Sequence, residues 1–240
     1  MMINTTKTVR ELAVEVAGAT RVFEKLGIDY CCGGGKALEE ACAVAGVSAE
    51  DVARSLEEIA RAKEGGELKD WNAESLTQLI SHIINKHHVF TREELDRLDP
   101  LLAKVCKVYA DKHPELPRIQ ALFQELKREL TAHMMKEEQV LFPYVAELEE
   151  ASNDESAKPL AFFGTVQNPI RMMMTEHDAA GEILRSIRKL SADFAAPADA
   201  CVSYQTLYQS LEELEQDLHQ HIHLENNILF PRAIEMESVS

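Results

Sequence analysis

The sequence predicts an all-α protein: an up-down-up-down four-helix bundle preceded by a small helical N-terminal domain. Ala, Leu and Glu are plentiful, while the 240 residues include only 10 Gly and 8 Pro, a composition that favours helices. Long segments of the C-terminal part carry apolar residues at helical spacing. One stretch also occurs twice, at 133–149 and 221–237. Four long helices joined by short connections are typical of an antiparallel bundle.

The N-terminal domain is expected to span residues 1–66. A tight turn at 27–35 carries the adjacent pair Cys31-Cys32, followed by three glycines that allow positive φ and close backbone approach. A linker at 65–73 should lead to the second domain. The short helices predicted for the first domain lie at 9–16, 19–26, 36–45 and 48–63.

The second domain is expected to span residues 75–240. Its first helix should run from about 75 to 110, with Pro100 as a candidate break, because proline removes a backbone donor from a helix. Proline-containing or polar loops separate the helices that follow. Those three helices are predicted at about 118–150, 169–190 and 200–230.

The duplicated stretch carries the motif His-x-x-x-Glu followed by Leu-Phe-Pro. His133 and Glu137 form the first copy, and His221 and Glu225 form the second. Residues i and i+4 share one face of a helix, and in both copies that face continues an apolar stripe. A buried carboxylate without a partner is very costly. The duplication therefore predicts a shared buried metal site.

Each helical pair also offers one further histidine: His82 in the first pair and His177 in the second. Two histidines per metal, two bridging carboxylates and a bridging oxygen would leave one open position on each of two metals. Nitrogen and oxygen ligands without thiolate favour iron or manganese over a closed zinc site. The predicted ligands are His82, His133, Glu137, His177, His221 and Glu225.

Four other histidines are interpreted differently. His87 and His88 are expected in solvent, on the outer part of the first long helix. His219 and His223 form a rival i, i+4 pair, but they lie outside the apolar stripe and are expected at the surface or rim. A lone histidine on an apolar face is more often a satisfied core residue than a ligand, and it is the duplication that favours the metal site.

Two acids adjoin predicted ligands without completing the motif. Glu129 stands one helical turn before His133, and Glu176 directly precedes His177. Either could hydrogen-bond to a metal ligand without binding the metal itself, or could relay protons to the site. Surface acids are common in this chain, so a solvated position is the alternative for both.

Composition restricts the partners. The net charge of −16 should repel nucleic acid and anionic membranes. The sequence contains neither an apolar run of membrane-spanning length nor a signal-peptide pattern at its start, so a cytoplasmic location is expected. Five cysteines, two of them adjacent, do not resemble a secreted disulfide framework.

The motifs together resemble a known family. The histidine and glutamate pattern is similar to that of hemerythrin-like di-iron bundles. Residues 29–34, Asp-Tyr-Cys-Cys-Gly-Gly, resemble the short domain fused to such bundles in the RIC family (repair of iron centres, YtfE/ScdA type). Tyr30 stands where that family usually has Phe. Oxygen-carrying hemerythrins have five histidines, and the four seen here argue against simple oxygen carriage.

The resemblance implies two non-haem iron ions per chain, oxo-bridged, in a homodimer induced by nitric oxide or oxidative stress. It implies repair of damaged iron–sulfur proteins by iron donation, with Cys31 and Cys32 in redox exchange or iron handover. A di-iron nitric oxide reductase, with Glu129 or Glu176 supplying protons, is one alternative, so enzymatic activity is left open. A sensor or scavenger that binds O2 or NO is the other.

Overall fold

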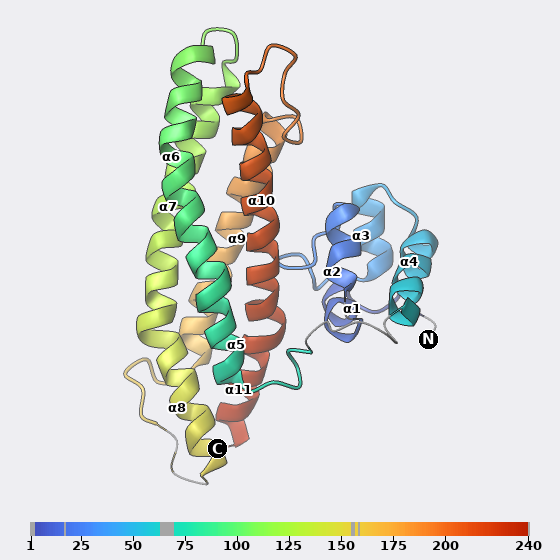
Figure 1. Cartoon of the computed structure of the whole chain (residues 1–240). Helices are drawn as coiled ribbons and strands as arrows, with labels where there is room; N and C mark the ends of the chain where they lie inside the picture. The colour runs from blue at the N-terminus through green and yellow to red at the C-terminus, as the bar shows by residue number, and fades with distance from the viewer. Residues whose placement is uncertain (1–2, 17, 63–69, 155–156, 158, 240) are drawn as a thin grey trace.

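The computed structural model describes residues 3–16, 18–62, 70–154, 157 and 159–239. A long bundle of helices stands beside a compact group of short helices (Figure 1), and the prediction of an all-α fold is confirmed. The expected boundary at 66 and most of the linker lie outside the described residues. No helix in the described part of the chain is long and apolar enough to cross a membrane.

The bundle consists of four helical rods, three of which contain a π-helical turn. Around the bundle, α6 contacts α7, α7 contacts α9, α9 contacts α10, and α10 closes the ring on α6. The rods are α5 (Leu76–His82), η2 (Ile83–His88) and α6 (Val89–Tyr109); α7 (Glu115–Lys136), η3 (Glu137–Leu141) and α8 (Phe142–Asn153); α9 (Gln167–Leu190); and α10 (Val202–Leu224), η4 (Glu225–Leu229) and α11 (Phe230–Val239).

Apolar side chains fill the bundle in two clusters with a polar zone between them. One cluster lies along α6, α7, α9 and α10; the other joins α5, α8 and α11 to the start of α9. The first rod does not break at Pro100. Leu98 and Leu102 on either side of this proline are fully buried, and their packing outweighs a proline cost of about 3 kcal/mol.

The two acids that end the duplicated stretches close each helical pair in the same way. Glu149 of α8 accepts hydrogen bonds from the backbone nitrogens of Leu76 and Thr77 at the start of α5, at 2.6 and 2.9 Å. Glu237 of α11 accepts from the backbone nitrogen of Val166, just before α9, at 2.9 Å. A carboxylate satisfies the free donors at a helix N-terminus. The repeat therefore forms two equivalent helical hairpins.

Within residues 3–16 and 18–62, four short helices build the N-terminal domain around their own apolar core. Thr8 and Glu11 form a reciprocal capping box at the start of α1, which fixes where this helix begins. Of the cysteines outside the vicinal pair, Cys42 and Cys106 are buried, whereas Cys201 is exposed. The short helices are α1 (Val9–Glu15), α2 (Ala19–Lys25), α3 (Leu38–Ala45) and α4 (Ala49–Ala62).

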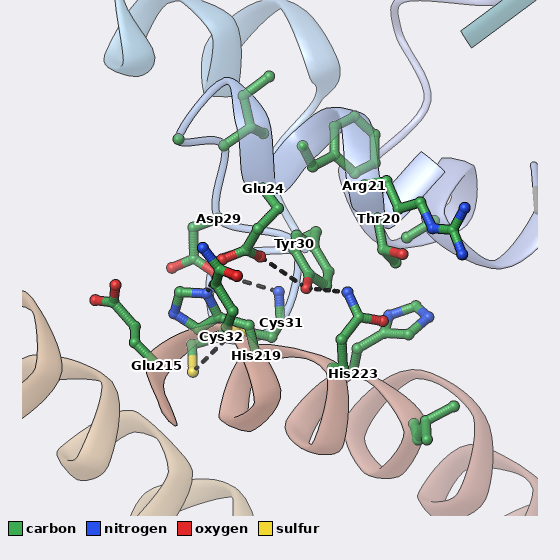
Figure 2. Close-up of a pocket in the computed structure, with 18 of the residues that line it drawn as sticks. Thr20, Arg21, Glu24, Asp29, Tyr30, Cys31, Cys32, Glu215, His219 and His223 are labelled. Atoms are coloured by element: carbon green, nitrogen blue, oxygen red, sulfur yellow. Dashed lines mark hydrogen bonds and ion pairs between the residues drawn. The ribbon is translucent and has the colours of Figure 1, made fainter. Parts of the chain in front are cut away.

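The loop between α2 and α3 rests on the bundle. Figure 2 shows Tyr30, Cys31 and Cys32 at this contact, facing the helix that carries His219 and His223. Ile222 of α10 joins the apolar core of the N-terminal domain, so the two domains share buried surface.

Candidate metal centre

π-Helical turns mark three of the four rods at the level of the polar zone. Glu137 begins η3 and Glu225 begins η4. Pro143 and Pro231 follow each turn, and a proline can neither donate to the carbonyl four residues earlier nor fit beside it. Widening the helix locally avoids that clash, and such π turns are frequent at functional sites.

Four donors form the first cluster, called here the His133 group: His133, Glu137, His177 and Glu225. All of them are buried, and their donor atoms lie within 4.8 Å of one another. Nε2 of His133 is 3.3 Å from Oε1 of Glu137, and Nε2 of His177 is 3.1 Å from Oε2 of Glu225. The two Nε2 atoms are 3.0 Å apart. All of these donor atoms converge on one point.

Four donors also form the second cluster, called the His88 group: His88, Glu137, His221 and Glu225. Nε2 of His88 is 3.3 Å from Oε2 of Glu137, and Nε2 of His221 is 2.9 Å from Oε1 of Glu225. Each glutamate thus gives one oxygen to each group. Two carboxylates shared in this way could bridge two metal positions.

His82, predicted as a ligand, belongs to neither group. Its ring packs against Trp71, with ring centroids 4.2 Å apart, and His88 occupies the place expected for it. The cause is η2, because its i→i+5 spacing carries the apolar stripe from Ile83 to His88 instead of to position 87. Counting positions along a regular α-helix therefore could not place His88 on the inner face.

The expectation of solvated outer histidines is also wrong. His87 and His88 are 1% and 0% exposed. His87 hydrogen-bonds to Asp217 at 3.0 Å and stacks on His221. The rival pair lies under the N-terminal domain instead of at an open surface. His219 is half-buried against Glu24, and His223 is buried beside Tyr30.

The donor set fits a metal. Both carboxylate oxygens of Glu137 and Oε2 of Glu225 are buried and make no hydrogen bond within the described part of the chain. Their neighbours are imidazole nitrogens 3.1 to 3.3 Å away. Leaving a carboxylate in this condition is expensive, and a bound cation removes the cost. Two imidazoles and two carboxylates per position, with no thiolate, suit iron or manganese.

Electrostatics support the same conclusion. Burial alone would raise the pKa of Glu225, but the charge of His221, together with the close approach of His177, holds it well below its usual range. Burial would likewise lower the pKa of His133, yet Glu137 and Glu176 raise it to about 10. The centre therefore favours negative carboxylates and requires positive charge beside them, which protons or metal ions supply.

Three of the four imidazoles have outer hydrogen-bond partners on Nδ1. His88 contacts Glu138 at 2.6 Å, and His133 contacts Glu176 at 2.9 Å. His177 contacts Asn226 at 2.9 Å. Such partners fix the tautomer that leaves Nε2 free for a metal. Glu138 and Asn226 directly follow the bridging glutamates, a signal in the repeat that sequence reasoning did not use.

Only one of the two predicted outer acids reaches the centre. Glu176 also contacts Lys136, and the hydrogen bond from His133, with help from that lysine, lowers its pKa to about 2. Glu129 is half-buried and is not among the outer partners described above. The structure thus brings Glu176, but not Glu129, against a ligand.

The vicinal cysteines lie beside a cleft of about 1580 Å³ between the two domains. Cys31 is buried and Cys32 half-buried, both as free thiols, with their sulfurs 3.8 Å apart. Oδ1 of Asp29 accepts from the backbone nitrogens of Cys31, Cys32 and Gly33. Burial and the neighbouring thiol raise the pKa of Cys31, the thiol contact being the larger cause.

Known proteins match both domains. Residues 79–233 match the Hemerythrin HHE cation binding domain, which indicates a metal-binding site, and residues 5–60 match a domain described as a Domain of Unknown function. A probable iron–sulfur cluster repair protein of Haemophilus influenzae is 36% identical over 93% of this chain and 95% of its own length. The iron–sulfur cluster repair protein YtfE of Escherichia coli O157:H7 is 37% identical over 93% and 94%.

Proposed function

Because this chain belongs to the iron–sulfur cluster repair family and carries its hemerythrin HHE domain, we propose that it repairs iron–sulfur clusters damaged by nitric oxide or oxidative stress by donating iron to them. The clients would be iron–sulfur proteins. From the resemblance we also propose a homodimer in the cytoplasm, for which sedimentation and cell fractionation are the tests.

One observation carries the proposal: two groups of four buried donors share the same two glutamates. We assign two iron ions to them, with the oxo bridge that the resemblance implies. The His88 group would hold one iron and the His133 group the other. When bound, the irons supply redox chemistry and are themselves the cargo for a damaged cluster. The chain's own part is to turn Nε2 of each histidine toward two shared carboxylates and to hold Nδ1 of His88, His133 and His177 with outer partners.

The vicinal thiols suit the handover step. Thiolates are soft ligands for iron–sulfur species, and Cys32 is partly open to the cleft. Burial of Cys31 means that the loop must move before both sulfurs can bind iron together. The double variant Cys31→Ala/Cys32→Ala should keep its helicity and iron, because no thiolate belongs to either donor group.

The test is iron transfer without oxygen. Iron-loaded protein is mixed with an NO-damaged [4Fe-4S] enzyme, and client activity and the iron left on the donor are followed together. Repair predicts that client recovery matches the iron lost. The double cysteine variant should start with the same iron and transfer it more slowly. A parallel sample of the damaged enzyme receives free Fe(II) alone. Donation is refuted if the client recovers no better with the protein than in that sample and the protein keeps its iron.

A nitric oxide reductase is the second candidate, and Glu176 is the observation that favours it. This acid hydrogen-bonds to His133 and is 29% exposed, so it joins the buried centre to solvent at a place where protons could be relayed. Anaerobic NO with excess reductant separates the candidates. Catalytic N2O formation supports the reductase, and uptake of NO in stoichiometric amount without product supports a sensor. The same assay with O2 tests scavenging.

A further inference from the structure

Asn226 joins the metal centre to the cysteine loop with one side chain. It is 4% exposed and directly follows the bridging Glu225. Its Oδ1 lies 2.9 Å from Nδ1 of His177, and its Nδ2 donates to the carbonyl oxygen of Cys31 at 3.4 Å. The amide therefore contacts a predicted iron ligand at one end and the vicinal thiol segment at the other.

The chemistry of an amide makes these two contacts depend on each other. Nε2 of His177 faces Glu225 and His133, so it is the metal-binding nitrogen. With a metal on Nε2, the ring proton must sit on Nδ1 and donate to Oδ1 of Asn226. The NH2 group of Asn226 then points to Cys31. Loss of the metal removes what holds the His177 ring in place, and a shift of the ring would move the amide away from the Cys31 carbonyl.

A second contact joins the Cys31-Cys32 loop to His177. Sγ of Cys32 lies 3.6 Å from the carbonyl oxygen of His177. A Cβ added at Gly181, one turn further along α9, would stand 3.3 Å from that sulfur. Close approach of the thiol to α9 thus depends on a small residue there. Both cysteines therefore contact groups that position His177.

The equivalent position in the other hairpin shows why an amide matters. Glu138 follows the bridging Glu137 and supports His88 in the way that Asn226 supports His177. An ionised carboxylate only accepts hydrogen bonds, whereas an amide accepts and donates. Asn226 can therefore support a histidine and hold the cysteine loop together, which Glu138 could not do at that place.

We propose that Asn226 is a positioning residue that couples iron occupancy at His177 to the seating of the Cys31-Cys32 loop. The inference rests on the proposed iron centre and deepens it. Coupling between two sites is reciprocal. Iron at His177 holds the loop down and shields Cys31, and release of the loop loosens iron. The thiols would thus become available as the iron becomes ready to leave.

The experiment compares anaerobic alkylation of Cys31 by iodoacetamide in Fe(II)-loaded and metal-free protein, localised by tandem mass spectrometry. In the wild type, iron should slow alkylation by about fivefold or more, the lower end of typical coupling. Asn226→Asp keeps the acceptor for His177 and removes the donor for Cys31. Compared at measured and matched iron occupancy, the ratio of its two rates should fall to about one, as expected when coupling is lost.

Asn227 provides the matched control. It donates to the carbonyl of Tyr30 at 3.0 Å and contacts His223, so it holds the same loop without touching a predicted ligand. Asn227→Leu should speed alkylation in both states and keep their ratio. Asn226→Leu removes both contacts, and should also weaken iron retention about 10- to 100-fold, the usual effect of losing an outer partner.

Two results would overturn the proposal. One is an Asn226→Asp protein in which iron slows alkylation as much as in the wild type, and the other is an Asn227→Leu protein in which iron no longer slows it. A second arm uses only the wild type, in case the aspartate variant fails to fold. Protein alkylated at Cys31 should lose iron to a chelator faster than unmodified protein, and equal rates would contradict the coupling. A wild type that binds no iron refutes the proposed centre as well, whereas iron binding with a ratio of one refutes this inference alone.

Discussion

Replacing His88 or His82 by alanine separates the observed donor groups from the sequence-based expectation. His88 is fully buried, with Nε2 at 3.3 Å from Glu137 and 3.1 Å from Nε2 of His221. His82 packs against Trp71 outside both groups. We expect His88→Ala to empty the His88 group, and His82→Ala to keep both irons.

The size of the effect follows from the donor atoms. His88→Ala leaves three of four donors in its group, while the His133 group keeps all four. Even an outer partner is worth about 10- to 100-fold in metal affinity, so losing a direct ligand should cost more than about 100-fold at that position. Glu138→Gln, which alters only the outer partner of His88, should fall between His82→Ala and His88→Ala.

Iron is measured by mass spectrometry after dialysis against a chelator of graded strength. Wild type and His82→Ala should hold two irons per chain and His88→Ala one, with circular dichroism to verify folding. Equal iron loss in His82→Ala and His88→Ala, both folded, would refute the assignment of His88. Of these variants, only His88→Ala should lose the antiferromagnetic coupling between two oxidised irons.

Three further predictions concern other contacts. Glu176→Leu should weaken iron retention about 10- to 100-fold in the chelator assay, whereas Glu129→Leu should match the wild type; equal losses would place both acids at the centre. Glu149→Ala removes the cap of α5 and should lower the free energy of unfolding by about 1 to 3 kcal/mol, measured in urea. Arg188 donates to the buried Glu215 at 2.8 Å, so Arg188→Met should cost about 3 to 5 kcal/mol, and adding Glu215→Met should recover most of it. No recovery would mean that Arg188 acts through packing.

The fold and most donor residues were predictable because local rules decide them. An i, i+4 pair within regular helix shares a face whatever the tertiary structure, so His133 with Glu137 and His221 with Glu225 could be paired from spacing. The expectation that both glutamates are shared between two metals came from the duplication. The structure shows each of them facing both groups.

His88 could not be predicted, because its inward position depends on a π-helical turn that helical periodicity does not show. No proline lies at the position that Pro143 and Pro231 occupy after the other two π turns. The burial of His223 was hidden for a different reason: its cover is Tyr30, nearly two hundred residues earlier in the chain. Contacts between domains leave no spacing signal within either one.

The two closed hairpins give the metal centre a mechanical role. Each donor group takes one histidine and one glutamate from each hairpin. The cap at Glu149 lies within the first hairpin, whereas Glu237 caps α9 in the second and also accepts a hydrogen bond from the hydroxyl of Tyr144 in the first, at 2.7 Å. Bound ions would therefore add a link between the two hairpins at the level of the polar zone. Unloading them would leave uncompensated charge between the hairpins, so iron release would weaken the contact between the hairpins at this level of the bundle.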